Sequence, residues 1–308
     1  MKKVLCIGGA GYVGSKINEV LGPKYNIHNV DLNWFGATKD AQFNFVDYND
    51  ITDRYIKRYD VVILLAGHSS VKMCDDKFSS WNNNVRNFAT LLKKLNGTKF
   101  IYASSSSVYG NTTQDEIDEE FLDFSPINFY DMAKLHIDHL AKLSDTEYYG
   151  LRFGTVNGPA PHIRTDVMIN AMTNTAKTKG EIHLFIADTK RSILGINDLV
   201  RAIDTIIEND EDHRGVYNLA SFTSTSGEIA KVVGKISKVK VINKDTPKVI
   251  TNEKLEKKNY NFGVTTKKFE ETFNFKFKDT LDSIAHETIG KFETCEVKSN
   301  RSKPTEYE

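Results

Sequence analysis

The stretch that decides the fold is KVLCIGGAGYVGSKINEVLG, residues 3–22, at the start of the chain. Its first five residues form an apolar run typical of a strand, and residues 12–21 have the apolar spacing of a helix. Gly8, Gly11 and Gly14 lie between the two. Glycine there permits a tight turn and lets backbone N–H groups at the helix start approach a diphosphate, whose charge the helix dipole also favours. The stretch therefore predicts a strand–turn–helix unit that binds phosphate.

Asp31 closes the next predicted strand, NIHNVD at residues 26–31. In dinucleotide-binding proteins, a carboxylate roughly 20 residues beyond a glycine turn accepts hydrogen bonds from the ribose of the adenosine half. The carboxylate would repel a 2′-phosphate at that position, so the sequence favours NAD over NADP. The alternative interpretation of Asp31 is an aspartate that only serves a turn.

Strands and helices alternate through the first half of the chain. Short apolar and β-branched runs predict further strands at 41–47, 60–67, 99–104 and 148–154, and apolar spacing predicts helices at 81–95 and 127–143. Strands that alternate with helices pair in parallel through crossover connections. We therefore expect an α/β fold built on a Rossmann-type doubly wound parallel sheet.

The alternation loosens beyond Gly158. The sequence predicts a helix over 164–180, a strand and a helix within 189–209, a strand at 215–220, and a helix that starts at a capping box of Thr225 and Glu228. The final thirteen residues, 296–308, are polar and have no periodic pattern, which predicts a disordered tail.

The composition argues against several classes of protein. The chain has 308 residues, and Lys and Arg balance Asp and Glu at 41 each, so its formal net charge is zero. A nucleic-acid or membrane-surface partner would need a basic excess, and no apolar run is long enough to span a membrane. Cys6, Cys74 and Cys295 have neither a pairing pattern nor metal-ligand spacing. We therefore expect reduced thiols, no metal site and a cytoplasmic location.

A strand that ends in hydroxyls precedes a helix that carries a tyrosine and a lysine. KFIYASSSSVYG, residues 99–110, turns from an apolar run into four serines, and INFYDMAKLHIDHL places Tyr130 and Lys134 on one helical face. A phenol titrates near pH 10 and needs positive charge beside it, from the lysine and a nicotinamide, to act as a base at neutral pH. A serine hydroxyl at the strand's carboxyl end would hydrogen-bond the reacting oxygen. This combination predicts removal of a hydroxyl proton while a hydride leaves the same carbon.

The sequence resembles the extended short-chain dehydrogenases/reductases, in particular the NAD-dependent nucleotide-sugar epimerase/dehydratase family. The resemblance covers roughly residues 1–290 and rests, in order, on GGAGYVG, NVD, VDY, LLAG, NNNV, SSSSVYG, YDMAK, LRFGTVNGP and RSILGINDL. It implies NAD as cofactor, a nucleotide-diphosphate sugar as substrate, and a homodimer packed through the helices at 81–95 and 127–143. It also implies an NAD-binding domain and a smaller, mixed α/β C-terminal substrate-binding domain, formed by residues 1–155 plus 191–219 and by residues 156–190 plus 220–295.

The resemblance assigns roles at matching positions. It makes Ser105, Tyr130 and Lys134 catalytic. It assigns cofactor binding to Gly8, Gly11, Tyr12, Val13, Gly14, Asp31, Asp47, Tyr48, Leu65, Ala66, Gly67, Asn83, Tyr130 and Lys134. It assigns substrate binding to Ser105, Ser106, Thr155, Asn170 and Arg191. Arg191 would clamp the diphosphate through charge-assisted hydrogen bonds, and a plain surface arginine is its competing interpretation.

Departures from the family pattern narrow the reaction. Relatives that dehydrate sugars carry Asp-Glu directly after the catalytic serine or threonine, and decarboxylating relatives carry a glutamate where Ser107 stands. This chain has Ser106-Ser107, which cannot protonate a leaving hydroxyl, so a 4,6-dehydratase and a decarboxylase are both disfavoured. The usual Val-Tyr-Gly-Pro is Val-Asn-Gly-Pro at 156–159, and the usual sugar-contacting asparagine is Thr155, so the sugar stays open. We expect an epimerase. A net sugar-nucleotide oxidoreductase is the alternative within the family, and a non-catalytic NAD sensor is the alternative outside it.

Other polar residues are expected to have no direct role: His136, His139, Lys257, Lys258 and Cys74. The two histidines lack a third metal ligand, and the cysteine has no adjacent base. The lysines suit a solvated surface, and assistance in phosphate binding is their competing interpretation. Three more residues fall where a loop could either line the site or stay in solvent: His68, His162 and Arg164.

Overall fold

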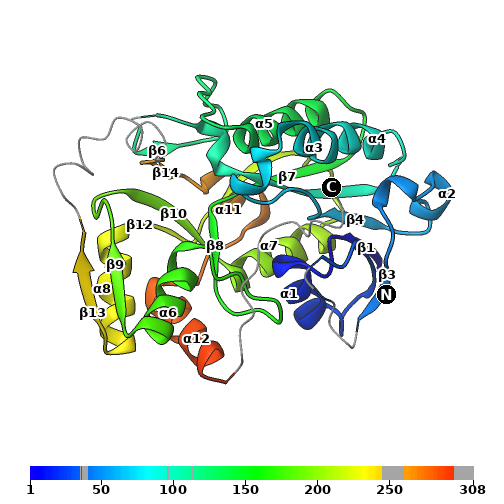
Figure 1. The fold of residues 1–308 in the computed structure, drawn as a ribbon. Coiled ribbons are helices and arrows are strands. Elements are labelled where there is room, and N and C mark those ends of the chain that lie inside the picture. Colours follow the sequence, from blue (N-terminus) through cyan, green and yellow to red (C-terminus); the bar gives the residue numbers. More distant parts are fainter. Residues whose placement is uncertain (35, 37–40, 96, 113, 245–259, 295–308) are drawn as a thin grey trace.

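The structure is a computed structural model that describes all residues except 35, 37–40, 96, 113, 245–259 and 295–308. The predicted tail at 296–308, Lys257, Lys258 and Cys295 lie outside the described residues. Figure 1 shows a large sheet with helices on both faces and a smaller group of strands and helices beside it. Within the described ranges, no helix is both long and apolar enough to cross a membrane.

Seven parallel strands form the large sheet, in the order β11-β7-β5-β4-β1-β2-β3. They are β1 (Lys3–Ile7), β2 (Asn26–Val30), β3 (Gln42–Asn44), β4 (Val61–Leu64), β5 (Lys99–Ser105), β7 (Tyr148–Phe153) and β11 (Gly215–Leu219). The chain builds outward from β1 to β3 and then in the other direction from β4 to β11. This reversal between β1 and β4 leaves a crevice at the strands' carboxyl ends, where doubly wound sheets bind ligands. The Rossmann-type sheet predicted from the alternation of strands and helices is confirmed.

Helices cover both faces of this sheet (Figure 1). One face carries α1 (Tyr12–Leu21), α7 (Ile196–Glu208) and α11 (Lys267–Phe273), and the other carries α2 (Asp53–Ile56), α3 (Lys77–Trp81), α4 (Asn87–Leu92) and α5 (Phe129–Lys142). Because both faces are covered, the central strands are apolar throughout, and every residue of β4 is buried. The α5 helix begins after Asn128, whose side chain accepts a hydrogen bond from the Asp131 N–H at 3.0 Å. This cap places Tyr130 in the first turn of the helix.

The predicted helix at 81–95 is less regular than its apolar spacing indicates. It begins earlier, at Lys77, and residues Asn82–Arg86 within it are π-helical. The apolar residues alone cannot show such a widened turn, because they keep facing the core on either side of it. The turn carries Asn83 and Asn84 toward the loop that follows β4.

The smaller group consists of short sheets and a helical core. Its strands pair in the orders β12-β10-β8, β13-β9 and β14-β6. They are β6 (Glu116–Ile117), β8 (Thr155–Asn157), β9 (Glu181–Leu184), β10 (Lys190–Gly195), β12 (Phe222–Thr225), β13 (Lys240–Asn243) and β14 (Gly263–Val264). The helices α6 (Met168–Lys179), α8 (Ser226–Ser237) and α12 (Leu281–Thr294) share one apolar core with β9. The capping box predicted at the start of α8 is confirmed, because Thr225 and Glu228 exchange both hydrogen bonds. The domain boundaries stay a prediction, and β10 pairs with β8 and β12 rather than with the large sheet.

Candidate active site

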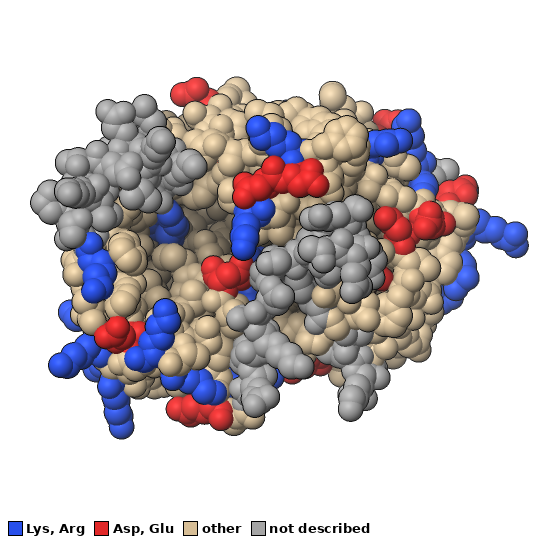
Figure 2. Space-filling model, viewed as in Figure 1, with Lys and Arg blue, Asp and Glu red and all other residues tan. Residues whose placement is uncertain are grey.

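A cavity of about 640 Å³ lies at the carboxyl ends of the large sheet, where the strand order reverses. Its volume is within the usual range for a ligand site. Every residue predicted to bind the cofactor lines it, and so do four of the predicted substrate-binding residues, Ser105, Ser106, Thr155 and Arg191. Figure 2 shows the molecule hollowed on this face, with basic atoms inside the hollow and at its rim.

The glycine turn forms one wall of the cavity. Gly8 has a φ of +92°, which favours glycine, and a Cβ there would lie 2.5 Å from the backbone nitrogen of Ala66. A Cβ on Gly14 would lie 2.4 Å from the Gly8 carbonyl oxygen, so the turn itself requires both glycines. A Cβ on Gly11 would meet only that oxygen, at 3.3 Å. The missing side chain at Gly11 therefore leaves room for a phosphate to approach the start of α1.

Asp31 follows β2 and lies beside the glycine turn. The backbone N–H of Ala10 donates to its Oδ2 at 2.9 Å, and the N–H of Asn33 donates to its Oδ1 at 2.7 Å. Burial raises the pKa of Asp31, and the two N–H groups and His162 oppose this rise. His162 donates from Nδ1 to the Ala10 carbonyl oxygen at 2.6 Å and so braces the turn. The carboxylate is held in place and retains lone pairs for a ligand's hydroxyls.

The π-helical segment holds the loop that follows β4. The Asn84 side chain accepts from the His68 N–H at 2.8 Å and donates to the His68 carbonyl oxygen at 3.1 Å. Gly67, with a φ of +146°, passes so close that a Cβ would lie 2.6 Å from the Asn84 amide oxygen. Asn83 donates to Nδ1 of His68 at 3.0 Å, and the Tyr48 hydroxyl donates to the Asn83 carbonyl oxygen at 3.0 Å. The sequence predicted Asn83 at this site and left His68 open between the site and solvent, and His68 is buried beside the cavity. The sequence missed the support that Asn84 provides.

The structure brings Tyr130, Lys134 and Ser105 together on one wall of the cavity. The Ser105 side chain lies near the Tyr130 phenol and acts to lower the pKa of that phenol. The Lys134 ammonium lies 5.7 Å from the centre of the Tyr130 ring and donates to the Ala103 carbonyl oxygen at 2.6 Å. Ser105 ends β5 and caps the short 3₁₀ helix Ser106–Tyr109. The serine run thus turns directly into the site.

Burial sets the ionisation of the tyrosine and of the lysine. It raises the pKa of Tyr130 to about 12, although the Ser105 side chain and the charge of Arg164 both act to lower that pKa. It lowers the pKa of Lys134 to about 8, although the charge of Asp138 acts in the opposite direction. The lowered phenol pKa expected from the sequence is therefore not a property of the chain alone. It needs the further positive charge that a nicotinamide supplies.

A buried carboxylate lies directly behind the serines. Asp131 follows Tyr130 in the sequence and has no exposed surface. It accepts from the Tyr260 hydroxyl at 2.8 and 2.9 Å, and the nearby Ser107 side chain acts to lower its pKa. The Oγ of Ser107 lies 2.8 Å from the Oγ of Ser105. Sequence reasoning missed this group, because Asp131 resembles an ordinary first-turn acid and Tyr260 lies in a distant segment without a motif.

Two arginines, Arg164 and Arg191, line the cavity. Burial lowers the pKa of Arg191 to about 10, and its guanidinium lies 5.6 Å from the centre of the Tyr260 ring. No carboxylate pairs with Arg191 among the residues that the structure describes, so an anionic ligand would be favourable there. Arg164 is paired with Asp166 at 2.7 Å and donates to the Ser69 carbonyl oxygen at 3.1 Å. Arg164, whose role the sequence left open, braces two loops at the cavity.

Some of the singled-out residues lie outside the cavity lining. Asn170, predicted to bind the substrate, is fully buried; it accepts from the Gly158 N–H at 3.0 Å and donates to the Arg164 carbonyl oxygen at 2.9 Å. Its amide holds the loop between β8 and α6, so it has no surface for direct contact with a ligand. His136 and His139 are exposed on α5. Nowhere in the described ranges do three potential metal ligands gather.

Comparisons with known proteins agree with this geometry. The sequence profile of the NAD dependent epimerase/dehydratase family matches residues 4–220. The ADP-L-glycero-D-manno-heptose-6-epimerase of Brachyspira hyodysenteriae is 26% identical over 266 residues, which cover 76% of this chain and 81% of that protein. The dTDP-D-glucose 4,6-dehydratase of Dictyostelium discoideum is 26% identical over 282 residues, which cover 77% of this chain and 62% of that protein. The UDP-glucuronic acid 4-epimerase of Bacillus cereus, solved with UDP-glucuronic acid and NAD, has the same fold, with a TM-score of 0.81 at 21% identity over 95% of this chain and 99% of that one.

Proposed function

This chain belongs to the NAD dependent epimerase/dehydratase family, and on that premise we propose that it epimerises a nucleotide-diphosphate sugar. It is an enzyme, and its cofactor is NAD. In the proposed reaction one sugar hydroxyl becomes a ketone transiently and is then restored on the opposite face, without net redox change. The observation that carries the proposal is that Tyr130, Lys134 and Ser105 meet in the cavity that the glycine turn lines.

The cavity suits NAD at both ends. Gly11 leaves space for the diphosphate at the start of α1, and Asp31 offers acceptors to the ribose of the adenosine half. Lys134 would hold the ribose of the nicotinamide half from α5. When bound, NAD takes up a hydride from a sugar carbon and returns it.

Tyr130 is the proposed proton acceptor and donor. With a pKa of about 12 in the chain alone, its phenol would rarely ionise at neutral pH. The phenolate becomes accessible once positive charge from the cofactor joins that of Lys134 beside it. Tyr130 then accepts the proton of the sugar hydroxyl as the ketone forms, and it returns that proton as the ketone is reduced. The proton count therefore balances over one cycle, as epimerisation requires.

The acids near Tyr130 support epimerisation over dehydration. Dehydration needs a carboxylic acid that can protonate a leaving hydroxyl. Asp131 follows Tyr130 in the sequence, and its carboxylate already accepts hydrogen bonds from several donors. Asp166 lines the cavity but is paired with Arg164. We therefore disfavour a 4,6-dehydratase, although one of the relatives carries that name.

The substrate side supports a diphosphate but leaves the sugar open. Arg191 suits a diphosphate because its guanidinium has no carboxylate partner in the described part of the chain. Ser106 and Thr155 line the same region and offer hydroxyls to a sugar. The similar proteins are named for sugars on ADP, dTDP and UDP. A panel should therefore include ADP-heptose, dTDP-glucose, UDP-glucose and UDP-glucuronic acid.

Product analysis across this panel tests the proposal. We expect one nucleotide sugar to be converted to its epimer without accumulation of NADH absorbance, whereas a net oxidoreductase would form or consume NADH in proportion to product. Replacing Tyr130 by Phe should lower kcat by about 10²–10⁴-fold and leave NAD affinity nearly unchanged. Failure to epimerise any nucleotide sugar, or full activity of the Tyr130→Phe variant, would refute the proposed function.

We also propose a homodimer that packs through α3 and α5. Phe78 is 81% exposed, and Trp81, Phe129 and Met132 are exposed on the same two helices. The helices adjoin, since the ring of Trp81 lies 5.0 Å from that of His136. A second copy would cover this patch about a two-fold axis. Sedimentation should show a dimer that Phe78→Ser weakens, and a monomer at all concentrations would contradict the proposal.

The free thiols of the chain suit the cytoplasm, which we propose as its compartment.

A further inference from the structure

Tyr260 connects an arginine of the cavity to the helix that carries the proposed base. Its side chain lines the cavity, and the Arg191 guanidinium lies over its ring, 5.6 Å from the ring centre. The Tyr260 hydroxyl donates to both oxygens of Asp131, at 2.8 and 2.9 Å, and accepts from the Asn128 amide at 2.8 Å. Asn128 caps α5, and Asp131 lies in its first turn next to Tyr130. One side chain therefore spans from the arginine to the start of α5.

The ring of Tyr260 is held at its edge and at its tip. It packs against the hydrophobic cluster that contains Val108 and Phe262, and the Phe262 ring lies edge-on to it, with 6.3 Å between the ring centres. Burial and the charge of Asp131 raise the pKa of Tyr260, so its phenol keeps the proton that it donates. The ring face beside Arg191 is thus fixed both by packing and by hydrogen bonds.

Arg191 has few other contacts that could hold it in place. In the described part of the chain its guanidinium donates to the carbonyl oxygen of the adjacent Lys190, at 3.1 Å, and no carboxylate pairs with it. A long side chain without a partner loses rotamer freedom when it binds a ligand, and this loss weakens binding. The negative face of an aromatic ring attracts a guanidinium, which stacks on it. Stacking therefore preorganises Arg191 without neutralising the charge that an anionic ligand would need.

Another arginine of this fold stacks on aromatic rings but has a carboxylate partner. The Arg152 guanidinium lies 5.0 Å from the centre of the Tyr109 ring and 5.3 Å from that of Phe124. Its Nε also donates to Asp138 at 2.8 Å, and this buried pair lies outside the cavity lining. The charge of Arg152 is therefore used within the fold. Arg191 has the aromatic face without the carboxylate and lines the cavity, an arrangement that suits an anionic ligand.

We propose that Tyr260 is a positioning residue whose ring holds the Arg191 guanidinium in the cavity, where it binds the diphosphate of the substrate. The inference rests on the proposed function, because a nucleotide-diphosphate sugar supplies that diphosphate. The Tyr260 hydroxyl has a separate role, since its bonds to Asp131 and Asn128 attach this segment to α5 and satisfy a buried carboxylate. The ring therefore determines affinity for the diphosphate, and the hydroxyl mainly determines stability.

The experiment compares two variants that lose the same hydroxyl. Tyr260→Phe keeps the ring, whereas Tyr260→Met replaces it by an unbranched, flexible side chain that fills much of the same space. Calorimetry measures the binding of UDP, dTDP, ADP, GDP and CDP to enzyme saturated with NAD, so that ADP cannot occupy the cofactor site. We expect Tyr260→Met to bind the tightest of these probes about 3–10-fold more weakly than the parent, and Tyr260→Phe to stay within about twofold. Both variants should lower Tm, because Asp131 loses a donor.

A double-mutant cycle tests whether the ring acts through Arg191. In an Arg191→Gln background, Tyr260→Met should cause almost no further loss of affinity. Phe121→Leu is the matched control, because Phe121 packs against the same hydrophobic cluster but lies outside the cavity lining. It should lower Tm and leave the affinity for the probe unchanged. Equal losses of affinity in the two Tyr260 variants, no loss in either, or additive effects of the Tyr260 and Arg191 changes would overturn the inference.

A fluorinated ring decides the question even if Tyr260→Met does not fold. Replacing Tyr260 by pentafluorophenylalanine keeps the shape of a phenylalanine ring but removes the negative charge from its face. Affinity for the probe should therefore fall about threefold or more below that of Tyr260→Phe, at a similar Tm. Equal affinities of these two variants would show that the ring acts by packing alone, and the inference would be wrong.

Turnover gives a readout that depends on the proposed function. Once a substrate is known, Tyr260→Met should raise KM about 3–10-fold and leave kcat within about threefold of the parent, because Tyr130 and Lys134 are unchanged. If the parent binds a nucleoside diphosphate but epimerises no nucleotide sugar, the proposed function fails and the binding contrast still decides the inference. If the parent with NAD binds none of the five probes, the inference is overturned, whatever the enzyme converts.

Discussion

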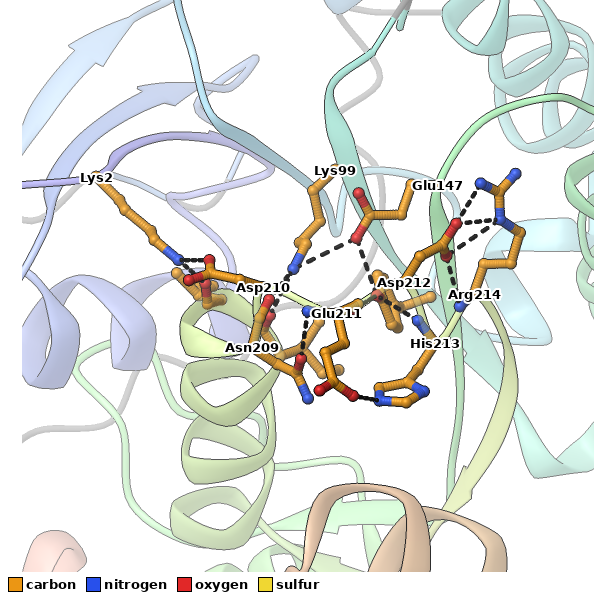
Figure 3. Close-up of polar contacts among 12 residues, drawn as sticks. Lys2, Lys99, Glu147, Asn209, Asp210, Glu211, Asp212, His213 and Arg214 are labelled. Carbon is orange, nitrogen blue, oxygen red and sulfur yellow. Dashed lines mark hydrogen bonds and ion pairs between the residues drawn. The ribbon is translucent and has the colours of Figure 1, made fainter.

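Cations have different partners at the two ends of the strands of the large sheet, which we call its amino edge and its carboxyl edge. At the amino edge, shown in Figure 3, Lys2, Lys99 and Arg214 each contact a carboxylate or carbonyl oxygen of the chain itself. At the carboxyl edge, Lys134 and Arg191 have carbonyl oxygens but no carboxylate as hydrogen-bond partners within the described ranges. The fold thus pairs the cations of the amino edge, whereas at the carboxyl edge it pairs Arg164 with Asp166 and leaves Lys134 and Arg191 without a carboxylate partner in the described ranges.

The amino-edge lysines attach the end of α7 to the sheet. Lys99 begins β5, and its ammonium donates to the Ile206 carbonyl oxygen at 3.1 Å and to that of Asn209. Lys2 precedes β1 and donates to the Ile207 carbonyl oxygen at 2.7 Å. These carbonyls have no helical N–H partner at the end of α7, and cations there also favour the helix dipole. The contacts stabilise the fold and are remote from the cavity.

The carboxyl-edge cations have the opposite energetics. Burial lowers the pKa of Lys134 to about 8 and that of Arg191 to about 10, which means that the folded chain disfavours both charged forms. Buried charges that destabilise the folded chain are typical of positions where the charge contributes to binding or catalysis. Removing a charge at the carboxyl edge should therefore lower activity and preserve stability. Removing one at the amino edge should lower stability and preserve activity.

Replacing Lys134 by Met should have the largest effect on turnover. Loss of the ammonium removes positive charge beside Tyr130 and a contact to the nicotinamide ribose, so we expect kcat to fall by about 10²–10⁴-fold. The Tm of the cofactor-free variant should be no lower than that of the parent at neutral pH, because a disfavoured buried charge is gone. Retained activity, or a large fall in Tm, would break the contrast between the edges.

The pH dependence of stability sharpens this prediction. Lys134 titrates at about pH 8 in the folded chain and near pH 10.4 when unfolded. Between these values the unfolded chain binds more protons, so stability rises with pH across this window. The cost is complete below about pH 8 and vanishes above the unfolded pKa. The Tm advantage of Lys134→Met should therefore shrink from about pH 7 to about pH 10, and an advantage that grows would contradict the assignment.

Replacing Arg191 by Gln should have the next largest effect, on substrate binding. A diphosphate that loses a charge-assisted fork should bind about 10–100-fold more weakly, seen as a higher KM with a smaller change in kcat. Lys190→Gln is the matched control, since its ammonium is paired with Asp115 at the surface. An unchanged KM in the Arg191 variant would identify Arg191 as an ordinary structural arginine.

The carboxyl edge also shows what the sequence could predict. The glycine turn, Asp31 and the Tyr130–Lys134 pair are set by local patterns, because each lies within or next to one element whose periodicity is visible. The parallel, doubly wound sheet followed from the alternation of strands and helices for the same reason. Residues predicted from such patterns line the cavity together.

Contacts between distant segments could not be predicted in this way. Tyr260 and Asp131 lie 129 residues apart in the sequence, and no motif marks either residue as part of the site. Asn170 matched a family position, yet tertiary packing uses its amide to hold the Gly158 loop. The π-helical turn that places Asn84 depends on a hydrogen-bond pattern that leaves the apolar spacing unchanged.

Replacing Asp31 by Asn tests the cofactor end of the carboxyl edge. The amide keeps one acceptor oxygen and loses the negative charge, so NAD affinity should fall by about tenfold and the discrimination against NADP should shrink. Equilibrium binding of the two cofactors, followed by the fluorescence of Trp34 in the cavity wall, measures both quantities. If the parent enzyme binds NADP as tightly as NAD, Asp31 is a turn aspartate and not the ribose partner.

Replacing Lys99 by Met at the amino edge should have the smallest effect on turnover. The Lys99 side chain is only 10% exposed and contacts two carbonyl oxygens and Glu147, so its loss should lower the free energy of unfolding by about 1–3 kcal/mol. Lys2→Met is the matched control, because Lys2 is paired with Asp210, which is 89% exposed. Exposed ion pairs contribute little, so the free energy of unfolding should fall by less in this variant. Chemical denaturation gives both values, and kcat should stay within about twofold of the parent, since neither lysine lines the cavity. A Lys99→Met variant that kept its stability but lost activity would show that the amino edge affects the active site. The contrast between a stabilising amino edge and a functional carboxyl edge would then be wrong.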